Sequence, residues 1–190
     1  MSRAPDGQVR LVILGRQGSG KGTQCALLVD HYAIPHISTG DMLREAGAAG
    51  TEFGQAAKAI MDRGDLLSDE VIVGAVQERL AHDDAAAGFL LDGFPRTVGQ
   101  AEALAAIAGP NVVVNLDVPT DLVLERMLAR GRADDTEDAI KRRLELYEEQ
   151  TAPLVSYYDD RGVLATVDGV GEVDEVFARV VKAIDANVGS

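Results

Sequence analysis

The segment at residues 11–23, with the sequence LVILGRQGSGKGT, constrains the fold more strongly than any other part of the chain. An apolar run ends at Gly15, and the spacing G-x-x-x-x-G-K then leads through Lys21 into a helix-like stretch, residues 24–32. This order of strand, glycine loop and helix is typical of a P-loop, whose glycines let backbone N–H groups turn toward a chain of phosphates. The helix adds the positive end of its dipole, and Lys21 adds a mobile charge for the outer phosphates. The loop glycines are Gly15, Gly18, Gly20 and Gly22.

Two other interpretations of this loop are weaker. A tight strand-to-helix turn can be rich in glycine without binding a ligand. A Rossmann dinucleotide site needs the pattern G-x-G-x-x-G, but after Gly18 and Gly20 the third glycine position holds Thr23. The strand before the loop and the helix after it therefore favour nucleotide phosphate binding.

The composition predicts a single domain, residues 1–190, that is long enough to bury a substantial core. Hydrophobic residues make up 46% of the chain but occur in short runs, so no membrane-spanning helix is expected. The polar first eight residues do not resemble a signal peptide, and we expect a cytoplasmic protein. Cys25 is the only cysteine, which excludes an internal disulfide and a multi-cysteine zinc site and predicts a small buried side chain.

The charge of the chain limits its partners. The net charge is −13, whereas a nucleic-acid-binding protein is expected to present a basic surface. An acidic protein that binds a nucleotide must gather its cations locally. Fourteen of the 18 basic residues are arginine, the side chain best suited to bidentate phosphate contacts, so the positions of the arginines are informative.

Short apolar runs alternate with helical stretches to the end of the chain. This pattern predicts an α/β fold: a P-loop three-layer sandwich, with a parallel five-stranded sheet covered by helices on both faces. Residues 39–67 contain helical pieces and no strand, which indicates a small helical excursion from the sheet. A long helical region ends near Tyr158 and is expected to bend or break near Pro153. The last helix is predicted to lay one apolar stripe on the sheet, formed by Val173, Val176, Phe177, Val180, Val181 and Ile184.

Asp92 is the first candidate for a metal-binding carboxylate. It ends a buried strand, as a Walker-B aspartate does, and could hold Mg²⁺ through water because Mg²⁺ dehydrates reluctantly. A turn aspartate that accepts backbone N–H groups is the other interpretation. Asp117 ends a later strand and is the rival carboxylate. Asp92 is favoured over Asp117 because Gly93 and Arg96 follow it directly.

Arginines provide a second group of candidate residues. Arg126 and Arg130 lie four residues apart, and further arginines follow at 132, 142 and 143. A solvated basic helix face, with neighbours such as Glu125 and Asp134, would give the same spacing. Together with Arg44 and Arg96, however, this cluster is the main local supply of positive charge in an acidic chain.

At this point the sequence resembles the nucleoside monophosphate kinases, and adenylate kinases in particular, over nearly its whole length. DGFPRT, at residues 92–97, is the most specific of the shared motifs. The matching segments are GSGKGTQ (18–24), ISTGDMLR (37–44), IMDRGDLLSDEV (60–71), GFLLDGFPRTVGQA (88–101), RMLARGR (126–132) and KRRLELY (141–147).

The resemblance implies two nucleotide sites and a set of residues that act in phosphoryl transfer. The ATP-binding residues it implies are Gly18, Ser19, Gly20, Lys21, Gly22, Thr23, Arg130 and Gly171. The AMP-binding residues it implies are Thr39, Arg44, Asp65, Leu66, Leu67, Gly93, Phe94, Pro95, Arg96, Gln100, Arg132 and Arg143. The catalytic residues it implies are Lys21, Arg96, Arg126, Arg130, Arg132 and Arg143.

The implied reaction is MgATP + AMP ⇌ MgADP + ADP, which would serve adenine nucleotide homeostasis in a monomeric enzyme without membrane or nucleic-acid partners. Residues 38–67 would form the NMP-binding subdomain and residues 130–140 a short lid, so zinc is not expected. Thr39 and Gln100 favour adenine over the similar UMP/CMP kinases, although Gln100 also suits a capping box with Thr97. A guanine-reading switch protein would need N-K-x-D, which the chain lacks at residues 115–118. Gln17 replaces the usual loop proline, and we expect a looser free loop.

Overall fold

The computed structural model describes residues 8–48, 52–63, 67–130 and 136–188, with only the backbone described for residues 46, 52–54, 61 and 130. A five-stranded parallel sheet forms the centre, in the order β2-β3-β1-β4-β5. The predicted α/β fold with a parallel five-stranded sheet is therefore confirmed. The strands are β1 (Val9–Leu14), β2 (His36–Ser38), β3 (Gly88–Asp92), β4 (Val112–Asp117) and β5 (Leu164–Asp168).

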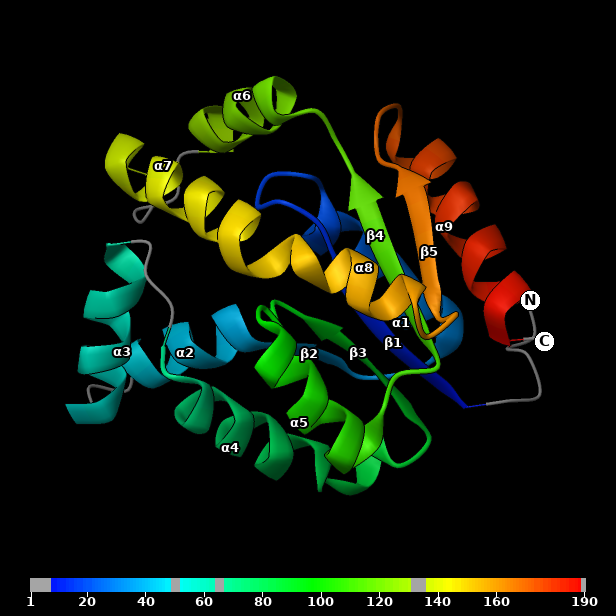
Figure 1. Cartoon of the computed structure of the whole chain (residues 1–190), viewed down its shortest axis with the longest axis horizontal. Helices are drawn as coiled ribbons and strands as arrows, with labels where there is room; N and C mark the ends of the chain where they lie inside the picture. Colours follow the sequence, from blue (N-terminus) through cyan, green and yellow to red (C-terminus); the bar gives the residue numbers. More distant parts are fainter. Residues whose placement is uncertain (1–7, 49–51, 64–66, 131–135, 189–190) are drawn as a thin grey trace.

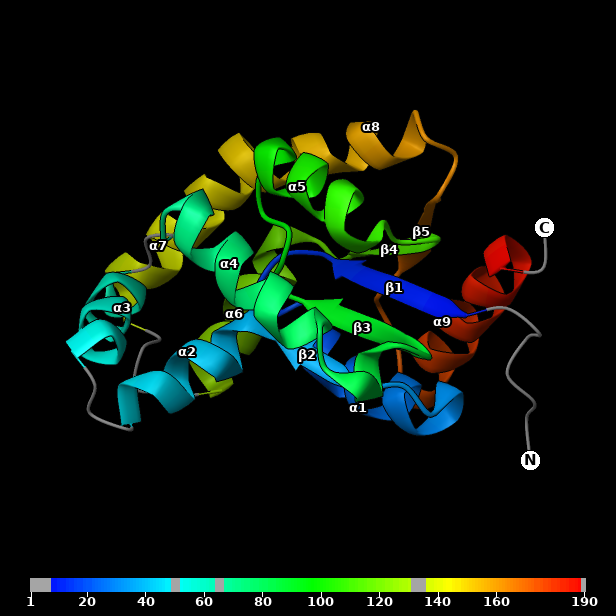
Figure 2. The same cartoon turned by 90° about the horizontal axis from the view of Figure 1, so that it is seen from below.

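Helices cover both faces of this sheet. In Figure 2, α1 and α9 lie on one side of the strands and α5 and α8 on the other. The first half of the chain contributes α1 (Lys21–Tyr32), α2 (Thr39–Ala48), α3 (Glu52–Asp62), α4 (Asp69–Leu80) and the short 3₁₀ turn η1 (Asp83–Ala85). The second half contributes α5 (Val98–Ala108), α6 (Thr120–Arg130), α7 (Glu137–Leu146), the π-helical turn η2 (Tyr147–Thr151), α8 (Pro153–Asp159) and α9 (Val173–Val188).

Alternation along the strands divides the core into two layers. On β1, Leu11 and Ile13 pack with Leu28 of α1, whereas Val12 and Leu14 belong to the layer that contains Leu104 of α5. Because neighbouring strand residues point to opposite faces, continuously apolar strands can fill both layers. Packing on both faces therefore fixes the strands, and the carboxyl ends of the strands lie together along one edge of the sheet.

Two helical pairs extend beyond that edge. Both views place α2 and α3, and also α6 and α7, at the end of the molecule toward which β1 runs (Figures 1 and 2). Helices α2 and α3 pack against each other, and the described part of residues 39–67 contains no strand, as predicted. No helix among the described residues has the length and apolar character needed to cross a bilayer.

One sequence expectation is confirmed and another needs adjustment. The long helical region is broken near Pro153, as predicted: it passes through the π-helical turn η2, and Pro153 then occupies the first turn of α8, where its missing N–H costs little. In α9 the predicted stripe is buried at Val176, Val180 and Ile184, but Val173 is 46% exposed because it opens the helix at the sheet edge.

Candidate active site

A cavity of about 590 Å³ opens at the carboxyl ends of the strands. Its walls come from the loop between β1 and α1, the start of α2, the segment after β3, and the helices α6, α7 and η2. Residues far apart in the sequence are therefore neighbours here. The predicted site residues that line it are Gly18, Gly20, Lys21, Gly22, Thr23, Arg44, Asp92, Gly93, Pro95, Arg96, Arg126 and Arg143.

The P-loop depends on backbone conformations that only some of its glycines adopt. Gly18 has φ +88°, and a Cβ there would lie 2.7 Å from Met127 Cγ and 2.8 Å from the carbonyl oxygen of Val123. The loop is thus pressed against α6, and a side chain at Gly18 would push it away. Gly22 differs, because it lies in the first turn of α1 and a Cβ there would meet no described atom within 4 Å. Gly22 leaves open space in the cavity wall, and its predicted part in turning backbone N–H groups toward phosphates stays a prediction.

Lys21 folds back onto the loop. Its Nζ donates to the carbonyl oxygens of Gly15, at 2.6 Å, and Arg16, at 2.9 Å. From α6, Arg126 Nη1 donates to the carbonyl oxygen of Ser19 at 3.3 Å. Two cationic side chains, Lys21 and Arg126, therefore contact the loop backbone.

Asp92 ends β3 and lines the cavity. Its Oδ2 lies 3.6 Å from His36 Nε2, and its side chain is 16% exposed. Burial by itself raises the pKa of Asp92, but His36, Lys21 and Arg96 outweigh that effect and lower its pKa below the ordinary value. The rival carboxylate, Asp117, is 65% exposed and is not one of the described residues that line the cavity.

Arg96 lies in a network of hydrogen bonds that joins α2, the segment after β3, and η2. Its Nε donates to the carbonyl oxygen of Gly93 at 2.8 Å, and Thr39 Oγ1 donates to the same oxygen at 3.0 Å. From η2, Thr151 Oγ1 donates to the carbonyl oxygen of Arg96 at 2.9 Å. Burial lowers the pKa of Arg96, and the nearby charges of Arg143 and Arg44 lower it further, against the opposing effect of Asp92. This concentration of positive charge produces a positive potential that favours the binding of an anion.

Gln100 lies behind Arg96 and is 2% exposed. Its backbone N–H donates to Thr97 Oγ1 at 3.1 Å, which confirms Thr97 as the cap of α5. Its side-chain oxygen accepts from the backbone N–H of Arg96 at 2.7 Å, one residue before the usual capping-box donor. Its amide nitrogen donates to Asp69 Oδ1 at 2.7 Å, so Asp69 and the Arg96 backbone fix both ends of the amide.

Other predicted residues lie near the cavity without lining it. Ser19, Thr39, Phe94 and Gln100 are buried behind its wall, and the peptide bond between Phe94 and Pro95 is cis. Leu67 packs on the core layer that contains Phe94, and Gly171 lies between β5 and α9. Asp65, Leu66 and Arg132, with the side chain of Arg130, lie outside the described residues.

Sequence reasoning missed several residues that build the site. Arg16 donates from Nη2 to Glu148 Oε1 at 2.6 Å and lies 5.3 Å from the centre of the Tyr147 ring, so it ties the P-loop to η2. Thr151 and His36 also line the cavity. An arginine inside the glycine loop was a usable signal for Arg16, whereas the π-helical turn that presents Tyr147 and Thr151 has no local sequence signal.

Comparison with known proteins agrees with this geometry. The sequence matches the family model described as adenylate kinase over residues 13–163. A protein of Stenotrophomonas maltophilia strain K279a named adenylate kinase is 54% identical over 187 residues, which cover 94% of this chain and 100% of the relative. Proteins of the same name from S. maltophilia strain R551-3 and Xylella fastidiosa strain 9a5c are 52% and 50% identical over 185 residues, which cover 93% of this chain and 99% of each relative. The chain therefore belongs to the adenylate kinase family of phosphotransferases.

Proposed function

We propose that this enzyme transfers the terminal phosphoryl group of MgATP to AMP at the described cavity and returns two molecules of ADP. The observation that carries this assignment is that a single cavity is lined both by the P-loop with Lys21 and by the arginines 44, 96 and 143. A donor triphosphate and an acceptor monophosphate need two such cationic regions within reach of each other. Arg126, Arg130 and Arg132 would complete the charge around the transferred group.

At the donor end, the loop from Gly18 to Thr23 would hold the ATP phosphates, with Gly171 near the adenine and Arg130 against the nucleotide. Lys21 now donates to two backbone carbonyls, and phosphate oxygens are stronger acceptors because they carry charge. We propose that ATP draws Lys21 from those carbonyls toward the outer phosphates.

At the acceptor end, the AMP phosphate would relieve the mutual repulsion of the three arginines at positions 44, 96 and 143. Gly93, Phe94 and Pro95 would shape this region, and residues 65–67 would contribute backbone groups. Thr39 and Gln100 would favour adenine, and Arg132 would join Arg143 in clamping the phosphates. Burial of Arg96 supports this role, because a charge removed from water interacts more strongly with an anion.

The donor set at Asp92 fits a hydrated Mg²⁺ ion. The carboxylate faces the cavity next to the P-loop, and its lowered pKa keeps it ionised at neutral pH. Oxygen ligands and retained water are what Mg²⁺ prefers. When bound with ATP, the ion would neutralise phosphate charge. The proposed phosphoryl transfer uses no zinc.

The chemistry needs no general base. The second pKa of a phosphomonoester is about 6, so the acceptor is already largely dianionic at neutral pH. The task of the protein is to bring two anions together in line and to exclude water. We propose that the subdomain at residues 38–67 and the short lid at residues 130–140 close over the substrates, in a monomer that acts in the cytoplasm.

The test is ADP formation from MgATP with AMP, UMP, CMP, GMP or dTMP offered singly as acceptor. We expect AMP to give the highest kcat/KM by a wide margin. Preference for UMP or CMP would replace the assigned acceptor. ATP consumption that is independent of any acceptor would contradict phosphoryl transfer between nucleotides.

A further inference from the structure

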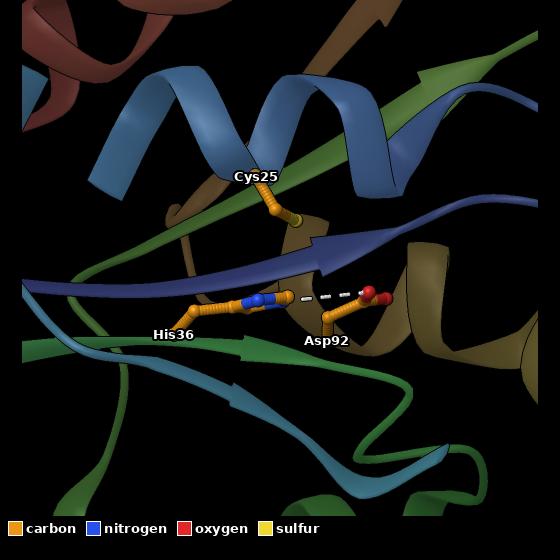
Figure 3. Close-up of side chains that lie close together, drawn as sticks. All are labelled: Cys25, His36 and Asp92. Carbon is orange, nitrogen blue, oxygen red and sulfur yellow. Dashed lines mark ion pairs between the residues drawn. The ribbon is translucent and has the colours of Figure 1, made fainter. Parts of the chain in front are cut away.

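Three side chains with metal-binding atoms converge between α1 and the strands β2 and β3 (Figure 3). Cys25 comes from α1, His36 from β2 and Asp92 from the end of β3. Their ligand atoms all lie within 4.8 Å of one another. Figure 3 shows the Cys25 side chain pointing from α1 toward the tips of His36 and Asp92, which face each other.

His36 and Asp92 face each other without a close hydrogen bond. The buried Nε2 atom of His36 lies 3.6 Å from Asp92 Oδ2, which is an ion-pair separation and longer than a hydrogen bond of ordinary length. An ion placed between these two atoms would give both of them a close partner. His36 and Asp92 line the cavity, so an ion can reach them from the nucleotide side.

The distances suit a tetrahedral ion. With metal–ligand bonds of about 2.0–2.3 Å, tetrahedral coordination places ligand atoms about 3.3–3.8 Å apart. The His36–Asp92 separation of 3.6 Å already lies in that range, and Cys25 needs only a small movement to join it. The fourth position would open to the cavity.

The donor types select the metal. One sulfur, one imidazole nitrogen and one carboxylate oxygen suit Zn²⁺ and Co²⁺, whereas Mg²⁺ takes oxygen ligands and does not use a thiol. Cysteine ligates a metal ion as the thiolate, so a bound ion would displace the thiol proton of Cys25.

We infer that Cys25, His36 and Asp92 form an inhibitory binding site for a thiophilic divalent cation of the Zn²⁺ type. On binding, the S–H bond of Cys25 breaks, the sulfur keeps the electron pair and bonds the metal, and the proton passes to water. No electron is transferred. The binding step stands apart from the proposed function; the inhibition rests on it, because the metal occupies the Asp92 carboxylate that we assign to MgATP.

Co²⁺ is the probe for the binding step. A Co²⁺ titration of the full chain without nucleotide should give a thiolate-to-cobalt charge-transfer band that saturates at one ion per chain. Because Cys25 is the only cysteine, that band reports this site alone. Zn²⁺ should displace Co²⁺ and remove the band, since it binds such sites more tightly. Absence of the band at stoichiometric Co²⁺ overturns the site.

Variants assign the other ligands. Both Cys25→Ser and Cys25→Ala should lose the band, and His36→Asn should weaken Co²⁺ affinity by at least about tenfold, the smallest effect expected when even an outer-shell partner is lost. His82→Asn is the matched control, because His82 is exposed and distant from the cluster in sequence, and it should titrate like the original chain. An unchanged His36→Asn titration overturns the assignment of His36. Circular dichroism and denaturant unfolding of the metal-free proteins confirm that each variant is folded.

Inhibition is measured separately. Micromolar Zn²⁺ should reduce ADP formation, the loss should be relieved by excess MgATP, and Cys25→Ser should resist it. A cobalt band without zinc inhibition contradicts the inhibitory role while leaving the metal site and the AMP phosphotransferase activity intact. Zinc inhibition that persists fully in Cys25→Ser places the inhibition elsewhere and overturns the proposal.

Discussion

The two ends of the cavity are built in different ways. The P-loop is one continuous segment whose backbone curves between β1 and α1 and is pressed on α6 at Gly18. The arginine end is assembled from α2, the segment after β3, α7 and η2, and side-chain hydrogen bonds such as Thr151 to Arg96 hold it together. The P-loop end depends on local backbone conformation, whereas the arginine end depends on contacts between segments far apart in the sequence. Substitutions should therefore affect the two ends differently.

The largest effect should come from Lys21→Ala. The change removes the mobile charge of the P-loop without touching the core, so we expect kcat to fall by about 10³-fold or more, at the upper end of what loss of one stabilising donor costs. Arg96→Ala should be similarly severe at the other end. Steady-state ADP formation measures both effects, with circular dichroism as the folding check. Near-normal turnover in either variant would contradict the role given to that residue.

A pair of glycine substitutions tests the local character of the P-loop. Gly18→Ala places a Cβ within 2.8 Å of α6 at a positive φ, so the loop must shift. We expect about 1–3 kcal/mol of lost stability, as for other strained backbone positions, together with weaker ATP binding. Gly22→Ala is the matched control for stability, because its Cβ meets open space on a helix.

Denaturant unfolding and the KM for ATP separate these two variants. Gly22→Ala should unfold like the original chain, or slightly later, because alanine is the better helix former by about 1 kcal/mol. It should still raise the KM for ATP, since its Cβ projects into the cavity wall. Equal destabilisation of both variants would refute the distinction between the turn glycine and the helical one.

The same contrast explains what the sequence could predict. Strand, loop and helix around Lys21 were predictable because their signals lie within about one helix length, as were the helices on both faces of the sheet and the Thr97 cap. The partners of Gln100 and Arg96 were not, because Asp69 and Thr151 lie 31 and 55 residues away from them and have ordinary local surroundings. The convergence of Cys25, His36 and Asp92 likewise depends on strand order, which local pattern does not specify.

Asp69 provides a sharper test of the arginine end. It is exposed, yet it accepts the Gln100 amide at 2.7 Å, so it should orient the group that we assign to adenine recognition. Asp69→Ala should raise the KM for AMP by about tenfold, equivalent to one hydrogen bond of about 1.4 kcal/mol, with kcat and the KM for ATP little changed. Asp69→Asn keeps an acceptor oxygen and should restore most of the affinity.

Glu70→Ala is the control for Asp69, because both acids lie in the first turn of α4 and both favour its helix dipole. If Asp69 acted only on the helix dipole, Asp69→Ala and Glu70→Ala would lose the same amount of stability and would have the same KM for AMP. That result would contradict a role of Asp69 in orienting Gln100. The comparison of AMP with other monophosphates adds a second readout. Asp69→Ala should narrow the preference for AMP, whereas Glu70→Ala should leave it unchanged.

The smallest effect should come from Thr151→Val, which removes the hydroxyl that η2 offers to the carbonyl oxygen of Arg96. The substitution keeps the side-chain shape and leaves that oxygen unpaired, so we expect a loss of about 1–2 kcal/mol in the free energy of unfolding. The kcat/KM for AMP should fall by a few-fold while the KM for ATP is unaffected, since the P-loop does not depend on this bond.

Thr166→Val, at an exposed threonine of β5, is the matched control, and its free energy of unfolding should stay within about 0.5 kcal/mol of that of the original chain. An equal loss of kcat/KM for ATP and for AMP in Thr151→Val would contradict this independence and would mean that η2 couples the two ends of the cavity. The Arg16–Glu148 contact at 2.6 Å would then be the connection to test next.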